Sequence, residues 1–235
     1  KMVGKTEVAL YGLAYSIGML VQLFISGMNS ALTPWMYSKI KKGDIRSMRK
    51  VLQLLSIVVV GIAVALMLIS PEMVLIFGSP KYREAVYVIP PVAASVFFIF
   101  IYNILSMPQF YYEKTQFLMA ASMAAAGANV VLNFIFIRLF GYIAAGYTTL
   151  ACYMLYSVGH YIVSKQILVN EGIQENLMNP GFLLACSVFL IGASIICNLI
   201  FPYRILRYAI LLASAGLVFW KKELLLKTMA DIRKK

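Results

Sequence analysis

Neutral polar side chains recur along the first apolar stretch of the chain at helical spacing. Their separations of three or four residues place them on one face of a helix. Amides and hydroxyls cost free energy in lipid, so such a face is expected to lie against other parts of the protein or a water-filled cavity. The pattern predicts either a helix that lines a hydrophilic pathway or a seam at which two helices pack closely. The series comprises Tyr15, Gly18, Gln22, Ser26, Asn29 and Thr33.

Two later apolar stretches also carry amides and hydroxyls. The fourth stretch is rich in alanine, and close helix packing is the favoured explanation for its polar residues, with a cavity as the alternative. The predicted substrate-cavity residues are Tyr15, Gln22, Ser26, Asn29, Thr33 and Asn103. The predicted helix-packing or cavity residues are Ser122, Asn129 and Asn133.

The composition is that of an integral membrane protein. Of the 235 residues, 62% are hydrophobic and 13% are charged, whereas soluble domains are about 45–50% apolar and about 25% charged. The net charge of +12 does not indicate a nucleic-acid partner, because the cations lie between the apolar stretches and at the ends of the chain.

Seven stretches are long and apolar enough to span a bilayer as helices, which takes about 20 residues each. We therefore expect an all-α integral membrane protein with about seven transmembrane helices. The expected helices cover residues 8–35, 51–70, 86–111, 115–137, 141–164, 180–201 and 205–220.

The distribution of basic residues predicts the orientation of these helices. Loops on one side hold 14 lysines and arginines, against 7 on the other, and basic loops stay in the cytoplasm. The N-terminus of the chain is therefore expected outside and the C-terminus in the cytoplasm. A cytoplasmic group next to the first helix should fix this topology against membrane lipids. It consists of Trp35, Lys39, Lys41, Lys42, Arg46, Arg49 and Lys50.

No arrangement of residues suited to catalysis can be assembled from the sequence. His160 is the single histidine and is expected near the cytoplasmic interface with its hydrogen bonds satisfied. The three cysteines have no metal-binding spacing. We therefore predict that the chain is not an enzyme and needs neither a metal ion nor a cofactor.

Four stretches resemble a known family of transporters. Together they resemble the polysaccharide flippases for O-antigen, capsule or exopolysaccharide units, within the multidrug/oligosaccharidyl-lipid/polysaccharide exporter superfamily. Such proteins have fourteen helices, and this chain is similar to helices eight to fourteen, the C-terminal half. The resemblance implies a five-helix lobe part over residues 1–165 and a terminal helix pair with a basic tail over residues 166–235. The stretches are EVALYGLAYSIG (7–18), NSALTPWMYSKIKKGD (29–44), SPKYREAVYVIP (79–90) and NVVLNFIFIRLFGYIAAG (129–146).

The resemblance also implies a function in polysaccharide biosynthesis. It implies alternating-access flipping of undecaprenyl-diphosphate-linked oligosaccharides across a bacterial-type cytoplasmic (inner) membrane. The expected partners are the lipid-linked oligosaccharide, the N-terminal half of the transporter and other polysaccharide-assembly proteins. Alternatives are a multidrug antiporter or lipid II flippase of the same superfamily, and a membrane-embedded glycosyl polymerase or acyltransferase.

Overall fold

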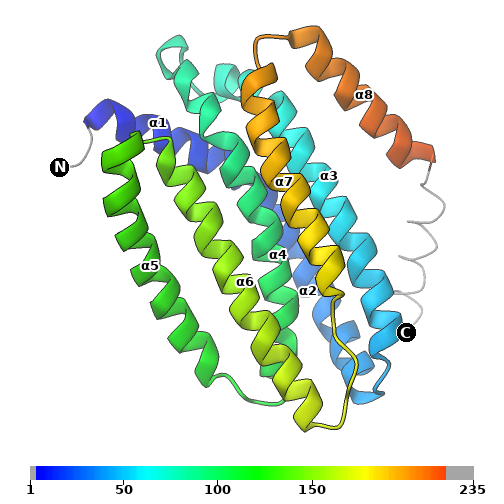
Figure 1. The fold of residues 1–235 in the computed structure, drawn as a ribbon. Coiled ribbons are helices and arrows are strands. Elements are labelled where there is room, and N and C mark those ends of the chain that lie inside the picture. Colours follow the sequence, from blue (N-terminus) through cyan, green and yellow to red (C-terminus); the bar gives the residue numbers. More distant parts are fainter. Residues whose placement is uncertain (1–3, 221–235) are drawn as a thin grey trace.

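Residues 4–220 are described by the computed structural model and form helices joined by short turns (Figure 1). Together with the apolar composition, this confirms the prediction of an all-α membrane protein. The elements are α1 (Lys5–Gly18), α2 (Leu20–Lys41), α3 (Ile45–Phe77), the 3₁₀ helix η1 (Pro80–Tyr87), α4 (Ile89–Tyr111), α5 (Gln116–Phe140), α6 (Ala144–Asn170), α7 (Pro180–Ile200) and α8 (Arg204–Trp220).

Five helical stretches of residues 4–220 are long and apolar enough to cross a membrane. The other two predicted segments also form helices, α6 and α8. Helix α6 is less apolar because hydroxyl groups and a histidine interrupt it, and α8 has only 17 residues. The five stretches are Lys5–Lys41, Ile45–Phe77, Ile89–Tyr111, Gln116–Phe140 and Pro180–Ile200.

The first predicted helix is divided in two at Met19, between α1 and α2. The division occurs where the backbone approaches α4, since a Cβ atom at Gly18 would lie 2.5 Å from Val92 Cγ1. Beyond it, α2 continues through Pro34 to Lys41 instead of ending near residue 35. Polar residues before and after Met19 therefore do not share one continuous helix face.

Helix α3 is longer than the predicted segment 51–70 and includes its flanking residues on both sides. It begins after Asp44, whose carboxylate accepts a hydrogen bond from the Ser47 backbone N–H, as a helix N-cap does. At the other end it continues past Pro71 and so includes Glu72, which the sequence had placed in a loop. A carboxylate thus lies inside a helix long enough to span the membrane.

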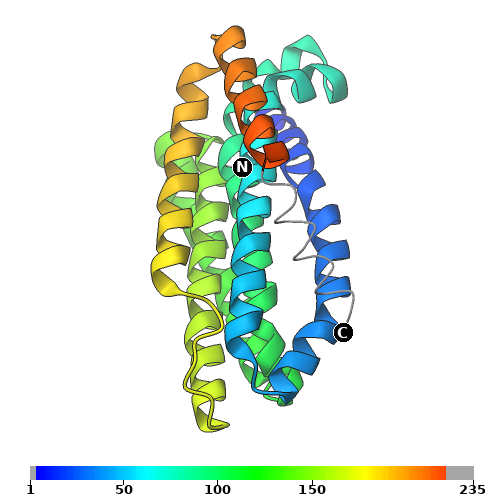
Figure 2. The same ribbon diagram turned by 90° about the vertical axis from the view of Figure 1, so that its right-hand side faces the viewer.

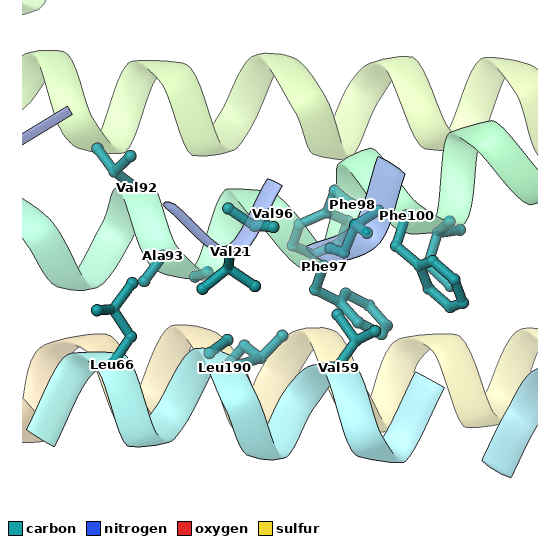
Figure 3. Packing of buried hydrophobic residues seen from close by; sticks show 14 of the residues in the cluster. Val21, Val59, Leu66, Val92, Ala93, Val96, Phe97, Phe98, Phe100 and Leu190 are labelled. Carbon is teal, nitrogen blue, oxygen red and sulfur yellow. The ribbon is translucent and has the colours of Figure 1, made fainter. Parts of the chain in front are cut away.

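Helix α4 lies at the centre of the bundle and contacts α1, α2, α3, α6 and α7. Residues 89–101 are all buried. In Figure 3 the ring of Phe97 on α4 lies against Val59 of α3, and Leu190 of α7 lies on the same side of α4. Helix α6 packs against α4 and also contacts α5, so α4 positions the other helices.

The turns that precede α3, α5 and α7 gather at one end of the bundle (Figure 1). Arg46 and Arg49 reach Glu175 with N–O distances of 3.3 and 3.7 Å, and Lys114 reaches Glu171 at 3.0 Å. These turns belong to the set of loops predicted to be cytoplasmic. Their common location agrees with that grouping, and the orientation across the membrane stays a prediction.

The terminal helices pack on the face of the bundle formed by α3. Helix α7 contacts α3 and α4, and α8 leans against α3 (Figures 1 and 2). The predicted division at residues 165/166 falls inside α6, which continues to Asn170. The existence of a separate terminal pair stays a prediction, and the basic tail lies outside the described residues.

An ion pair between a buried arginine and a partly exposed glutamate joins α8 to α3. The guanidinium of Arg207 donates to both carboxylate oxygens of Glu72 at 2.8 and 2.9 Å and to the Leu68 carbonyl at 2.6 Å. The Tyr208 hydroxyl donates to the same carboxylate at 2.9 Å. The Arg207 side chain is only 4% exposed, so this cation is paired within the protein and does not reach a polar surface.

Candidate functional site

A cavity of about 530 Å³ opens between α1, α4, α5 and α6. Five tyrosines form much of its wall, together with amide, hydroxyl and thiol side chains. None of the described lining residues is charged. The wall consists of Tyr11, Tyr15, Tyr102, Ser122, Ala125, Ala126, Asn129, Val130, Thr149, Cys152, Tyr153 and Tyr156.

The tyrosine rings of this cavity contact one another in pairs. Tyr102 and Tyr153 have ring planes only 6° apart, with centroids at 6.3 Å. Tyr156 meets the same Tyr102 ring edge to face, at 4.7 Å. On α1, the centroids of Tyr11 and Tyr15 lie 5.8 Å apart. The contacts between α4 and α6 orient aromatic surface along one side of the cavity.

Two hydroxyl contacts connect the walls of the cavity. Tyr11 Oη lies 3.3 Å from Thr149 Oγ1, which joins α1 to α6. Ser122 Oγ lies 2.8 Å from Tyr156 Oη, which joins α5 to α6. Thr149 Oγ1 also donates to the Ala145 carbonyl at 2.8 Å, so Tyr11 is the donor in the first contact. The hydroxyl oxygens keep acceptor capacity, and one hydroxyl of the second contact keeps its O–H donor. The cavity can therefore offer a ligand both flat aromatic faces and neutral hydrogen-bonding groups.

The predicted cavity residues divide into two groups in the structure. Tyr15 lines the cavity, and so do Ser122 and Asn129. Ser26 is exposed on α2. Asn103 is half-buried and its Nδ2 donates to the Ile99 carbonyl at 2.8 Å, within its own helix.

The remaining residues of the predicted stripe, Gln22, Asn29 and Thr33, lie on α2 outside the cavity. Thr33 Oγ1 donates to the Asn29 carbonyl at 2.8 Å and lies 3.7 Å from Met107 Sδ of α4. The side-chain oxygens of Gln22 and Asn29 are buried without a hydrogen-bond partner. The stripe is interrupted because the helix is divided at Met19.

Asn129 and Asn133 also connect α5 to α6. Asn133 Nδ2 donates to Asn129 Oδ1 at 2.9 Å, and Thr148 Oγ1 of α6 donates to Asn133 Oδ1. Asn129 Nδ2 lies 3.7 Å from Cys152 Sγ. Asn129 therefore combines the two predicted roles, helix packing and cavity lining, whereas Asn133 contributes to packing.

The predicted topology anchors differ in their surroundings. Lys41, Lys42, Arg46 and Lys50 are exposed, and Trp35 is buried. Arg49 Nε donates to the Asn176 carbonyl at 2.8 Å, so this residue fastens the loop before α7.

Lys39 is only 6% exposed, and its ammonium group pairs with Asp44 at the start of α3. Hydrogen bonding from Lys39, and then from Ser47, lowers the pKa of the Asp44 carboxyl to about 2. The ion pair joins the end of α2 to the start of α3 across a three-residue turn.

Sequence reasoning missed several residues of the cavity wall, namely Tyr11, Thr149, Tyr153 and Tyr156. The available signal was the helical spacing of tyrosines within apolar stretches, such as Tyr11 with Tyr15. Spacing alone does not tell which faces of separate helices meet. The tertiary arrangement is what assembles these tyrosines around one space.

Comparison with known proteins identifies the family. The model of the MatE family matches residues 1–135, more than half of the chain. The match includes the cavity walls contributed by α1, α4 and most of α5. Searches of curated proteins and of solved structures found no match. The chain is a multi-pass membrane protein that belongs to the MatE family of exporters, within the multidrug/oligosaccharidyl-lipid/polysaccharide exporter superfamily.

Proposed function

We propose that this chain is part of a transporter that flips undecaprenyl-diphosphate-linked oligosaccharides from the cytoplasmic to the outer leaflet of the inner membrane. The transporter works by alternating access and supplies polysaccharide biosynthesis. The observation that carries the proposal is the uncharged cavity between α1, α4, α5 and α6, with its five tyrosines.

The chemistry of the cavity wall supports a carbohydrate ligand. Sugar rings stack their C–H faces on aromatic rings, and Tyr102 and Tyr153 supply such rings as a nearly parallel pair in the cavity wall. Their hydroxyl groups exchange hydrogen bonds with neutral side chains such as Ser122 and Asn129. The volume of about 530 Å³ falls within the range of about 300–1,000 Å³ that is typical of ligand pockets.

The diphosphate of such a substrate needs a different environment from its sugars. Diphosphates are held best by arginine or lysine side chains, and none of the described cavity-lining residues is a cation. We therefore propose that the partner half of the transporter contributes the diphosphate-binding cations. In this division the tyrosine cavity holds the sugar portion of the substrate.

Multidrug export is the second candidate, because electron-rich tyrosine faces also attract organic cations. A cavity selected for cations is expected to contain a carboxylate as counter-charge, and none of the described lining residues supplies one. This difference favours the oligosaccharide. The two functions predict opposite substrate preferences for the same cavity.

A reconstitution experiment tests the proposal. The full-length transporter is placed in vesicles as the wild type and as Tyr15→Leu/Tyr153→Leu. Flipping of a fluorescent undecaprenyl-diphosphate-linked disaccharide is measured beside ethidium transport. We expect the double variant to flip the disaccharide at least about tenfold more slowly, because two stacking surfaces are lost. The matched control, Val131→Leu, changes an exposed side chain of α5 that does not line the cavity, and it should retain the wild-type rate. Loss of ethidium transport with unchanged disaccharide flipping would overturn the proposal in favour of multidrug export.

A further inference from the structure

A buried polar pair lies directly behind the tyrosine cavity. Gln109 of α4 and His160 of α6 are both 0% exposed. Gln109 Nε2 lies 2.8 Å from His160 Nδ1 and also donates to the Leu105 carbonyl at 3.3 Å. An amide NH₂ group is only a donor, so Nδ1 accepts and the neutral imidazole carries its proton on Nε2. The pair fixes both the tautomer and the plane of the imidazole.

The imidazole contacts two tyrosines of the cavity wall. Its centroid lies 4.5 Å from the Tyr156 ring at an interplanar angle of 89°, and 5.8 Å from the Tyr102 ring. It also meets Phe117 of α5 edge to face, with ring centroids at 5.4 Å and an interplanar angle of 81°. The perpendicular contact with Tyr156 is sensitive to the orientation of both rings, whereas the contact with Tyr102 is tilted at 31°. A change in the imidazole plane therefore acts on Tyr156 directly, and on Tyr102 also through the edge-to-face contact between the two tyrosines at 4.7 Å.

Packing alone does not account for the polar atoms of this pair. Gln109 Oε1 and His160 Nε2 are buried without hydrogen-bond partners, so the expectation that the hydrogen bonds of His160 are satisfied holds at Nδ1 and is wrong at Nε2. Each unpartnered atom costs about 1–3 kcal/mol. An apolar side chain and a phenyl ring would fill the same space without that cost. What leucine and phenylalanine lack is the hydrogen bond between α4 and α6 that sets the ring plane.

We propose that Gln109 and His160 are positioning residues that set the orientation of Tyr102 and Tyr156, and thereby the shape of the sugar-binding cavity. The inference rests on the proposed function for the role of the cavity. The orientation of Tyr156 also extends to α5, since its hydroxyl lies 2.8 Å from that of Ser122. The pair thus acts on three walls of the cavity without touching the ligand.

Three variants of the full-length transporter in nanodiscs test the inference. His160→Phe keeps an aromatic ring but removes the acceptor for Gln109. Gln109→Leu/His160→Phe also removes the Gln109 amide that His160→Phe leaves without its hydrogen-bond partner. Ser164→Ala is the control, because Ser164 is buried one helical turn beyond His160 and its hydroxyl has no partner. The measurements are thermal stability, the ¹⁹F resonance of 3-fluorotyrosine at position 156, and the KM and maximal rate for the fluorescent lipid-linked disaccharide.

We expect His160→Phe to lower thermal stability, to shift or broaden the Tyr156 resonance, and to raise KM about three- to tenfold with a maximal rate within about twofold of the wild type. The double variant should recover stability, because both polar partners are gone, while the resonance and KM stay altered. Ser164→Ala should leave the resonance and KM unchanged.

The outcomes separate positioning from simple packing. Recovery of the resonance together with stability in the double variant would assign the pair a merely structural role and overturn the inference. An unchanged resonance in His160→Phe would also overturn it. The resonance alone decides the positioning role, whereas an altered resonance with unchanged KM contradicts only the proposed role of the cavity in holding the disaccharide. The two failures are therefore distinguishable.

Discussion

Helices α4 and α5 are alike in length and apolar composition, but α4 is buried inside the bundle and α5 lies on its exposed side. They have 23 and 25 residues, and their most apolar stretches have mean hydropathies of 1.8 and 1.7. Yet 89% of that stretch is buried in α4 and none of it in α5. Apolar composition places a helix in the membrane but does not place it within the bundle, because lipid is as apolar as the side chains it replaces.

The two helices are held by different kinds of contact. Around α4, phenylalanines and branched aliphatic residues pack between α1, α2, α3, α6 and α7, and the Ser95 hydroxyl donates to a carbonyl of its own helix. Helix α5 packs mainly on α6, and Ser122, Asn129 and Asn133 connect it to that helix through polar contacts. Dense packing fixes the central helix, whereas small residues and hydrogen bonds attach the outer one.

The largest contrast is expected from truncating an isoleucine on each helix. Ile104→Ala on α4 should lower the free energy of unfolding by about 2–4 kcal/mol, because a 1% exposed side chain leaves a cavity. Ile135→Ala on α5, where the side chain is 44% exposed, should change it by less than about 0.5 kcal/mol. Equilibrium unfolding in mixed micelles measures both. Equal losses of stability in the two variants would show that burial does not determine the cost of truncating an isoleucine.

Glycine substitutions next to α4 and on α5 should show the same contrast, with smaller changes in the free energy of unfolding. Gly18→Ala should cost about 1–3 kcal/mol, since the added Cβ would meet Val92 of α4 at 2.5 Å. Gly127→Ala on α5 meets nothing within 4 Å and should stabilise the protein by up to about 1 kcal/mol through helix propensity. Thermal melting of both variants in the same detergent provides the measurement. A destabilising Gly127→Ala would contradict the open surroundings of α5.

Substitutions of polar residues should destabilise the protein more in α5 than in α4, the reverse of the effect expected for isoleucine truncation. Asn133→Leu removes the contacts with Asn129 and Thr148 and should cost about 1 kcal/mol. Ser95→Ala on α4 removes a bond within one helix and should stay within about 0.5 kcal/mol. A double-mutant cycle of Asn133→Leu with Thr148→Val isolates the contact between α5 and α6. A coupling energy near zero would show that small-residue packing alone attaches α5.

The smallest effect is expected from a change of pH. Helices α4 and α5 contain no carboxylate, so the pH dependence of the free energy of unfolding is tested at Asp44, just before α3. The Lys39 hydrogen bond lowers the pKa of Asp44 to about 2, so its folded value lies below the unfolded value of about 3.9. Its contribution to stability is present above the unfolded pKa and is lost as pH falls toward the folded pKa. Wild type and Asp44→Asn should therefore differ by a constant amount from pH 5 to 7 and converge as the pH approaches 2. A difference that grows on acidification would contradict this pairing.

Long apolar stretches made the helices predictable from the sequence, whereas the exporter superfamily was indicated by the resemblance of four stretches to known transporters. Tyr15, Ser122 and Asn129 could be selected because neutral polar residues are uncommon in such stretches. Tyr153 and Tyr156 could not, since their role depends on which helix faces meet. Likewise, Gln22 was separated from Tyr15 by a local division of the helix at Met19 that no hydropathy pattern predicts.

The ion pair between Arg207 and Glu72 links parts of the chain that the ribosome makes at different times. The two residues are 135 positions apart, which corresponds to about 7–27 s of synthesis at 5–20 residues per second. Until Arg207 arrives, the Glu72 carboxylate inside α3 lacks its main cationic partner. The short helix α8 in turn carries Arg207 in its first turn, where a lone cation would cost less than it does at the centre of a bilayer, about 2.5–3.5 kcal/mol. Each charge thus favours stable membrane integration of the other, so α8 completes the insertion of a helix synthesised long before it.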